Sequence, residues 1–489
     1  MYDDLTNRYL RKAEETINLS YPETLPLHRA LMDKLNLHLD TTLPTTQWEW
    51  GRVASEFHNP RNFDFAEGAY STVDRLLEAA MDDPRGSWKF KSLLETPVVR
   101  LEPKPEPGKT KSVTHVVVTD GSKEYEIKCL NTVIAACAIE SPAILLRSAG
   151  GSIEDAFGRE CAKNFGHVTD HYIFYVTLPF FYRDMAKKDL LGGMKLQTDI
   201  TFQYLDNSTA LANISLDASG FLPRRNVPDS ELPQFIIAYI LPSELQRDNK
   251  VELNDKHEPR IEVGYASEPY LDGKKNVLRT FAVDVMNKIA DVLDVRFVKH
   301  PFPDADYTPL ATVTLADIEL GELGPGGVAH EMGSIPMPDG GGRRGIVDAD
   351  LKMQYGWDNV YVCDLSVFPY SPAANPTLSL AALALRLSDR LLPEAETRYQ
   401  PIIVYNVLAQ TVWVSMTLSN NTEGPSIGPA ERTEIGSGKS VTWKRETREA
   451  LFVYRCACAT DFNVQMVRPG INTLIVTPPP EKSATCQCA

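Results

Sequence analysis

The stretch VYVCDLSVFPYSPAANPTLSLAALALRL, residues 360–387, decides the fold of this chain. Its first five residues alternate and are rich in β-branched side chains, so they predict a buried strand that ends at Asp364. A loop with two prolines follows. Asn375 and Pro376 then suit the cap and the first position of a helix that runs to about residue 392. Because this helix is apolar nearly all round, we expect it to be buried.

The end of this strand and the start of this helix are where a ligand is expected. In open α/β sheets, ligands bind beyond the carboxyl ends of the strands. The helix N-terminus presents free N–H groups and the positive end of its dipole, which suits an electron-rich group. Asp364 and Asn375 would both lie at this edge, so they are candidate ligand-binding residues.

An earlier motif, HEMGS at residues 330–334, contributes a histidine. Histidine titrates nearest to neutral pH and therefore suits removal of a proton from a hydroxyl group. The amide of Asn375 offers a donor and an acceptor, and can hold a substrate oxygen without titrating. The spacing alone does not bring His330 and Asn375 together. A loop histidine bonded to backbone, and an asparagine that only caps its helix, are the plain structural alternatives.

A second stretch, NTVIAACAIESP at residues 131–142, predicts another buried strand that runs into a helix. Ser141 is the expected cap of that helix, with Pro142 behind it. The helix should end near Gly150, because glycine readily takes the left-handed conformation that closes a helix.

Together these stretches resemble the C-terminal signature of the glucose–methanol–choline (GMC) oxidoreductases, flavoenzymes that oxidise alcohols. The family combines a His-x-x-Gly-Thr/Ser motif, a strand end Val-x-Asp-x-Ser-x-x-Pro, and a His or Asn before a Pro-Thr-Leu helix. By this resemblance, His330 is the base that takes the substrate hydroxyl proton and Asn375 is the second catalytic residue. Asp364 matches the aspartate that contacts the ribityl chain of the flavin. The Asn-Pro-Thr-Leu form looks most like the pyranose oxidase and choline oxidase branches.

The resemblance also implies which neighbouring residues contact FAD, the cofactor of the family. They flank the matched positions in both stretches: Leu365, Ala374, Pro376 and Thr377 in the first, and Ala136 and Cys137 in the second. Cys137 replaces a glycine that the family usually has, and a side chain there would crowd a cofactor that approaches the backbone closely. The stretch NFGHVTDH at residues 164–171 resembles the family's Val-Gly-x-Asn-Leu-x-Asp-His turn.

The first half of the family's signature is missing. The family begins with a βαβ unit that carries Gly-x-Gly-x-x-Gly, whose helix N-terminus holds the ADP pyrophosphate. The glycine runs at residues 324–327 and 340–342 lack a preceding strand and a following helix, so they are interpreted as loops. Three explanations are open: a truncated gene product, a split protein completed by a second chain, or a degenerate relative that no longer binds flavin.

Length and charge narrow the class of protein. The 489 residues, 43% of them hydrophobic, have room for two or three domains. A net charge of −15 argues against nucleic acid or an anionic membrane as a partner. No apolar run approaches the length that spans a membrane. No secretory signal precedes the chain, which leaves both a cytoplasmic and a secreted location open. A homo-oligomer is compatible with these data.

The expected fold class is α+β or α/β, in four segments. Residues 1–164 form a partial FAD-binding domain, and residues 321–397 return to it with the catalytic motifs. Residues 165–320 form an antiparallel substrate-binding sheet, because residues 172–178, 211–216 and 234–241 are β-rich. Residues 277–295 have helical spacing.

Residues 398–489 are expected to form a small β-sandwich-like module, because short apolar runs alternate there with turn residues. It is either a packing appendage or a module that binds carbohydrate or a partner, for which exposed Trp413 or Trp443 would be a sign. The tail carries Cys456, Cys458 and two more cysteines near the end of the chain. Their Cys-x-Cys spacing matches zinc poorly, so no metal site is expected, and disulfides are an alternative.

These observations predict an FAD-dependent oxidoreductase that acts on the CH–OH group of a small-molecule alcohol or sugar. The alternative is a non-catalytic relative, or a partner subunit that does not bind FAD by itself.

Overall fold

The computed structural model is an α+β protein. It describes all residues except 18, 21–25, 38–46, 52, 57–67, 70, 74–75, 77–90, 104–111, 184–194, 204, 217–233, 246–247, 263–270, 300–308, 324–325, 328–329, 340–343, 393–399, 417–431, 446–448, 457–461, 468–471, 477 and 479–489. Among the described residues, no helix combines the length and the apolar character needed to cross a membrane.

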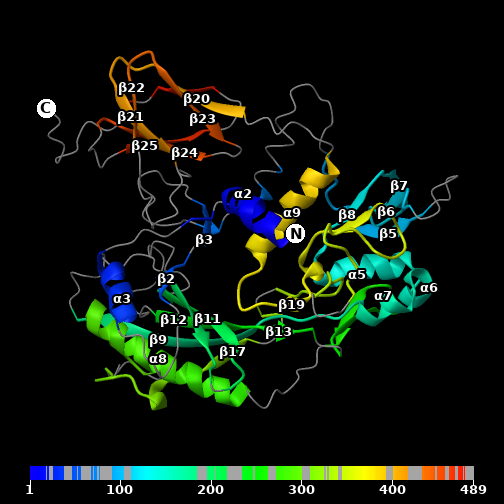
Figure 1. The fold of residues 1–489 in the computed structure, drawn as a ribbon, viewed down its shortest axis with the longest axis horizontal. Helices are drawn as coiled ribbons and strands as arrows, with labels where there is room; N and C mark the ends of the chain where they lie inside the picture. The colour runs from blue at the N-terminus through cyan, green and yellow to red at the C-terminus, as the bar shows by residue number, and fades with distance from the viewer. Residues whose placement is uncertain are drawn as a thin grey trace.

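The largest sheet is antiparallel and has the order β16-β9-β12-β11-β10-β2, with β17 also paired to β9 (Figure 1). Three of its strands cover the β-rich runs expected from the sequence. Its strands are β2 (Glu49–Trp50), β9 (Tyr172–Tyr182), β10 (Lys195–Thr201), β11 (Thr209–Leu216), β12 (Gln234–Leu241), β16 (Val295–Phe297) and β17 (Gly321–Leu323).

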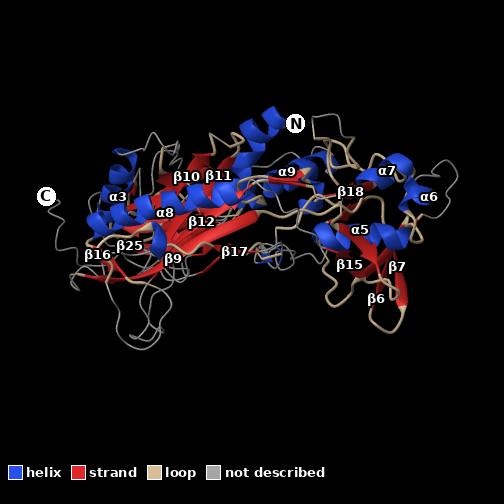
Figure 2. Cartoon of the chain, turned by 90° about the horizontal axis from the view of Figure 1, so that it is seen from below, coloured by secondary structure: helices blue, strands red, loops and turns tan. Residues whose placement is uncertain are grey.

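Two helices, α3 (Pro26–Leu37) and α8 (Leu271–Leu293), pack on one face of this sheet. Alternate residues of β9, such as Phe174 and Val176, are fully buried against them, as a half-buried strand requires. The helical spacing expected at residues 277–295 is present in α8, with Phe281 and Ile289 in the core. Figure 2 shows this layer as one lobe of the molecule, with α5 (Cys137–Ser148) and the strands β6 (His115–Thr119) and β7 (Glu124–Lys128) in another.

The second lobe is built on two parallel strands that are far apart in the sequence. Strand β8 (Thr132–Ile134) pairs with β18 (Val360–Val362). Helix α5 (Cys137–Ser148) follows the first strand, and α9 (Thr377–Leu391) follows the second after a loop. Around them lie α6 (Ile153–Phe157), α7 (Arg159–Asn164), and an antiparallel sheet of β5 (Val98–Glu102), β6 (His115–Thr119) and β7 (Glu124–Lys128).

Helix α9 contains a buried charged residue. The side chain of Arg386 is only 4% exposed. It is buried because a helix formed by α1 (Tyr2–Asp4), η1 (Leu5–Tyr9) and α2 (Leu10–Thr16) packs along α9 (Figure 1). The guanidinium pairs with Asp4 and Asp350, each at 2.8 Å, so burial of the charge is compensated.

The C-terminal region is a sandwich of two sheets, β23-β20-β26 and β22-β21-β24-β25, that share one apolar core. Trp413 and Trp443 are both partly buried, and Trp443 packs on that core. Cys456 is disulfide-bonded, and the other cysteines of the tail lie outside the described residues. The strands are β20 (Gln400–Asn406), β21 (Val412–Met416), β22 (Thr433–Ile435), β23 (Ser440–Arg445), β24 (Glu449–Tyr454), β25 (Phe462–Val467) and β26 (Asn472–Ile475).

Short elements complete the described part of the chain. They are β1 (Leu19–Ser20), β3 (Val53–Glu56), β4 (Gly68–Ala69), β13 (Ser243–Glu244), β14 (Lys250–Leu253), β15 (Pro259–Glu262), β19 (Tyr370–Ser371), and the 3₁₀ turns η3 (Leu315–Asp317) and η4 (Leu365–Val367). Strand β13 pairs with β19, which fixes the loop that leads to α9.

Candidate active site at the carboxyl ends of β8 and β18

Parallel pairing brings two of the motifs to one edge. The amide of Cys363 donates to the carbonyl of Ile134 at 2.8 Å, so the two strands end side by side. Asp364 and the turn at Ala136 and Cys137 therefore lie at the ends of two neighbouring strands. This is where ligands bind in open α/β sheets.

Asp364 is fixed by protein donors. Its carboxylate is 4% exposed, and Oδ1 accepts a hydrogen bond from the amide of Ser366 at 2.9 Å. Oδ2 accepts from the hydroxyl of Ser141, which in turn accepts from the amide of Ala136 at 3.0 Å. Ser141 was expected to cap its helix, but α5 begins four residues earlier, at Cys137. The reason is this hydrogen-bonded link between the strand ends, which uses the serine inside the helix.

Cys137 occupies an unusual backbone conformation at this edge. Its φ is +65°, in the left-handed region that glycine adopts freely and other residues adopt at a cost. The residue is exposed, whereas the other free cysteines of the described residues are at least partly buried. Burial of the sulfur, followed by the carboxylates of Asp364 and Glu331, raises the pKa of the Cys137 thiol. Those two carboxylates therefore lie near the sulfur.

The histidine motif is tied to the same edge by backbone hydrogen bonds. The amides of Gly333, Ile335 and Met337 donate to carbonyls of residues 365–367 at 3.2, 2.9 and 2.8 Å. The segment that follows His330 thus runs along η4, directly beyond Asp364. Gly333 has a φ of +95°, and a Cβ there would collide with the side chain of Leu245, so glycine is required.

His330 faces a second histidine, His171. Thr169 and Met332 form an antiparallel bridge with amide–carbonyl hydrogen bonds of 3.0 and 2.9 Å. Continuing this register by two residues on each chain places His171 opposite His330. Their rings are perpendicular, with centroids 5.2 Å apart. Nδ1 of His171 is 2.6 Å from the hydroxyl of Ser371.

Burial keeps both imidazoles neutral. Desolvation, followed by the charge of His330, lowers the pKa of His171 to about 4. Desolvation also lowers the pKa of His330, although the carboxylates of Asp170 and Glu331 oppose this shift. Near pH 7 His330 therefore carries a free lone pair on one ring nitrogen and can accept a proton.

Asp170 supports the turn before β9. Its carboxylate accepts from its neighbour's amide, that of His171, at 2.7 Å and from the amide of Gly326 at 2.8 Å. Desolvation is the largest cause that raises the pKa of Asp170. The glycine run expected as a loop is thereby held beside His330, as far as the structure describes it.

Asn375 lies four residues beyond Ser371, on the loop that enters α9. The helix begins at Thr377 with Pro376 as its cap, and no side chain caps it, so the cap expected from Asn375 is not formed. Asn375, Ala374 and Thr377 are exposed, and Pro376 is buried. Leu365 is partly buried in η4. Among the described residues, no hydrogen bond joins the side chains of His330 and Asn375.

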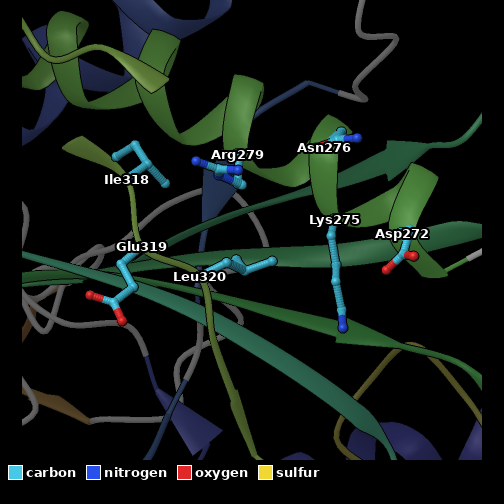
Figure 3. Close-up of a pocket in the computed structure, with 7 residues that line it drawn as sticks. All are labelled: Asp272, Lys275, Asn276, Arg279, Ile318, Glu319 and Leu320. Atoms are coloured by element: carbon cyan, nitrogen blue, oxygen red, sulfur yellow. The ribbon is translucent and has the colours of Figure 1, made fainter. Parts of the chain in front are cut away.

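A separate cleft of about 540 Å³ lies between the first turns of α8 and the loop before β17 (Figure 3). Asp272, Lys275, Arg279 and Glu319 line it. Lys275 pairs with Glu322 at 3.1 Å, and the guanidinium of Arg279 donates to the carbonyl of Leu315 at 2.8 Å. Both signs of charge are present and the cations have protein partners, so this cleft offers no catalytic group like His330.

His171 and Ser371 are the residues that the sequence motifs did not single out for this site. His171 stands in the turn at residues 164–171 that resembles a family motif, and this was the available signal. Nothing in the sequence pairs it with His330, because the contact depends on an isolated bridge between distant loops.

Comparison with known families agrees with the motifs. Residues 246–384 match the sequence model of a family described as GMC oxidoreductase. The matched range includes His330, Asp364 and Asn375. This segment of the chain is therefore similar to the GMC oxidoreductases.

Among solved structures, pyridoxine 4-oxidase from Mesorbium loti is similar to this chain, at 17% sequence identity and a TM-score of 0.46. The similarity covers 76% of this chain and 71% of that chain. No curated protein sequence matches this chain.

Proposed function

We propose that this protein oxidises the CH–OH group of a small-molecule alcohol or sugar, with FAD as the hydride acceptor. The observation that carries the proposal is the convergence of three sequence motifs at one edge. The histidine motif, the strand end at Asp364 and the turn at Cys137 are separated in the sequence, yet hydrogen bonds join them. Such convergence is what a shared ligand requires.

The residues at this edge suit the ring and ribityl part of a flavin. Helix α5 begins directly after β8, and α9 begins after the loop that follows β18. The free N–H groups at such helix N-termini favour an electron-rich ring. The hydroxyls of Ser334 and Ser366 are fully buried without a partner in the described structure. Cys137 departs from the pattern, because its side chain stands where a flavin would approach the backbone. The described residues contain no strand–glycine–helix unit for a pyrophosphate.

The residues that would hold the flavin come from both strand ends. They are Ala136 and Cys137 after β8, Asp364 and Leu365 after β18, and Ala374, Pro376 and Thr377 at the start of α9. When bound, FAD supplies the acceptor for two electrons and a proton equivalent.

The protein's own contribution is proton transfer and orientation. Neutral His330 takes the proton of the substrate hydroxyl, and the carboxylates of Asp170 and Glu331 stabilise the imidazolium that forms. Asn375 holds the substrate oxygen through its amide. The exposed position of Asn375 leaves its amide free to meet a substrate.

A non-catalytic role is the second candidate, and Cys137 favours it. A side chain at φ +65° beside Asp364 would narrow the space for a flavin. In that case the chain would act as a partner subunit, or as a scaffold completed by a second chain. We also propose that the chain is divided into four segments, with boundaries after residues 164, 320 and 397.

The absorption spectrum of the purified chain after incubation with FAD tests the proposal. Flavin bands that stay with the protein through gel filtration, and that bleach on addition of an alcohol, are expected. His330→Ala should retain the flavin bands, and the rate at which the alcohol bleaches them should fall by about 100-fold or more. A colourless protein would favour the non-catalytic role, and full bleaching by His330→Ala would remove His330 from its assigned role.

A further inference from the structure

Two neighbouring histidine rings each contain a buried nitrogen without a partner. Nε2 of His171 and Nδ1 of His330 are both inaccessible to solvent, and neither has a hydrogen-bond partner. Such orphaned nitrogens are rare because a buried polar atom without a partner is destabilising. The ring centroids are 5.2 Å apart. A ring nitrogen lies about 1.2 Å from its centroid, so a hydrogen bond of about 2.9 Å fits between the two rings after a rotation about χ2.

The other nitrogen of His171 fixes its tautomer. Nδ1 lies 2.6 Å from the hydroxyl of Ser371, which can donate or accept. Desolvation is the main cause of the lowered pKa of His171, and a hydrogen bond that the ring donates to the backbone of Pro372 opposes this shift, because a proline backbone can offer only its carbonyl. The carbonyl accepts, so Nδ1 of His171 carries the proton. Nε2 of His171, which is buried and has no partner, is then a bare acceptor in a ring that contacts the ring of His330.

We propose that His171 is a positioning residue, which accepts the Nδ1–H of His330 and so leaves Nε2 of His330 without a proton. This rests on the proposed function, because only a base with a bare Nε2 can take the substrate's proton. The opposite tautomer of His330 would set two lone pairs against each other at the buried contact. His171 thus selects the reactive form of its neighbour, as a hydrogen-bond partner does for other catalytic histidines.

The charged groups around the two rings favour a proton on His330 over a proton on His171. Among the described residues, the carboxylates of Asp170 and Glu331 act on His330, and the charge of His330 acts on His171. Both carboxylates favour the imidazolium of His330, whereas His171 has the neutral Ser371 and the Pro372 carbonyl. A proton that enters the pair therefore resides on His330.

The tautomer can be measured directly by ¹⁵N NMR of histidine-labelled protein at pH 7, without flavin or substrate. His330→Gln identifies the signals of His330. In wild type, His330 should show a protonated Nδ1 and a bare Nε2. In His171→Phe, which removes the acceptor but keeps a ring, His330 should shift mainly to the Nε2–H form. In His171→Gln, which keeps an acceptor near the position of Nε2, the wild-type tautomer should persist. His115→Gln is the matched control and should leave the His330 signals in place.

An Nε2–H tautomer of His330 in wild type would overturn the proposal, as would the same tautomer in wild type and His171→Phe. The wild-type spectrum decides the matter even if His171→Phe does not fold. The measurement needs no flavin. If the chain does not bind flavin, the proposed function is refuted, but the tautomer of His330 can still be determined. With flavin and alcohol, kcat should fall about 10- to 100-fold in His171→Phe and only a few-fold in His171→Gln.

Discussion

Acidification should destabilise the folded chain through His171. The ring is 2% exposed, and burial together with the charge of His330 holds its pKa at about 4, below the ordinary value of 6.5. Between these two values the unfolded chain binds a proton that the folded chain does not. The stability associated with neutral His171 is therefore fully present above pH 6.5 and is lost as the pH falls towards 4.

The magnitude follows from the two pKa values. Relative to pH 7, this single histidine lowers the free energy of unfolding by about 2 kcal/mol at pH 5 and about 3 kcal/mol at pH 4. Carboxylates also titrate in this range, so the comparison is between wild type and His171→Gln, which has no titratable ring.

The assay is urea denaturation followed by tryptophan fluorescence at pH 7, 6, 5 and 4. The fall in unfolding free energy from pH 7 to pH 4 should be about 3 kcal/mol larger in wild type than in His171→Gln. Equal falls in the two proteins, or a larger fall in the variant, would refute the reasoning.

Three further perturbations have defined outcomes. Cys137→Gly should stabilise the fold by about 1 kcal/mol in thermal melts and tighten FAD binding, because it relieves the left-handed strain and removes the side chain. Cys137→Ala keeps the strain, so an equal gain in that variant would contradict this explanation. Ser141→Ala should cost about 1–3 kcal/mol in chemical denaturation, because buried Asp364 loses a donor; an unchanged midpoint would argue against it. Arg386→Met should lower the free energy of unfolding by about 2 kcal/mol, because two carboxylates lose their cation. Adding Asp350→Asn to this variant should restore part of the loss. If it restores nothing, the ion pair between Arg386 and Asp350 does not contribute to stability.

Local chemistry made much of the fold predictable. The alternation at residues 360–364 and the Pro-Thr-Leu run predicted a strand, a loop and a helix, and the structure has β18 and α9 there. The β-rich runs and the 3.6-residue spacing likewise located strands of the large sheet and α8. These patterns are local, since each reflects which face of one element is buried.

Contacts between distant segments were not predictable in the same way. The parallel pairing of β8 with β18 depends on tertiary packing, and so does the bridge that sets His171 opposite His330. The start of α5 was misplaced because Ser141 bonds Asp364 instead of capping. Nothing in the local pattern indicated that the charged side chain of Arg386 would be buried, which happens because the helix of residues 2–16 packs along α9. Each of these errors concerns a partner that lies elsewhere in the chain.

The packing of residues 2–16 on α9 also has a consequence for biosynthesis. Tyr9 and Ala13 form a buried cluster with Ala382 of α9, and Arg8 and Tyr9 contact Asp389 at 2.9 and 3.0 Å. At about 5–20 residues per second, a ribosome needs roughly 20–75 seconds to reach α9 after it has made this helix. During that time the helix lacks its native contacts with α9. A nascent chain paused before α9 should therefore expose this helix to chaperones and proteases, and synthesis through α9 should end that exposure.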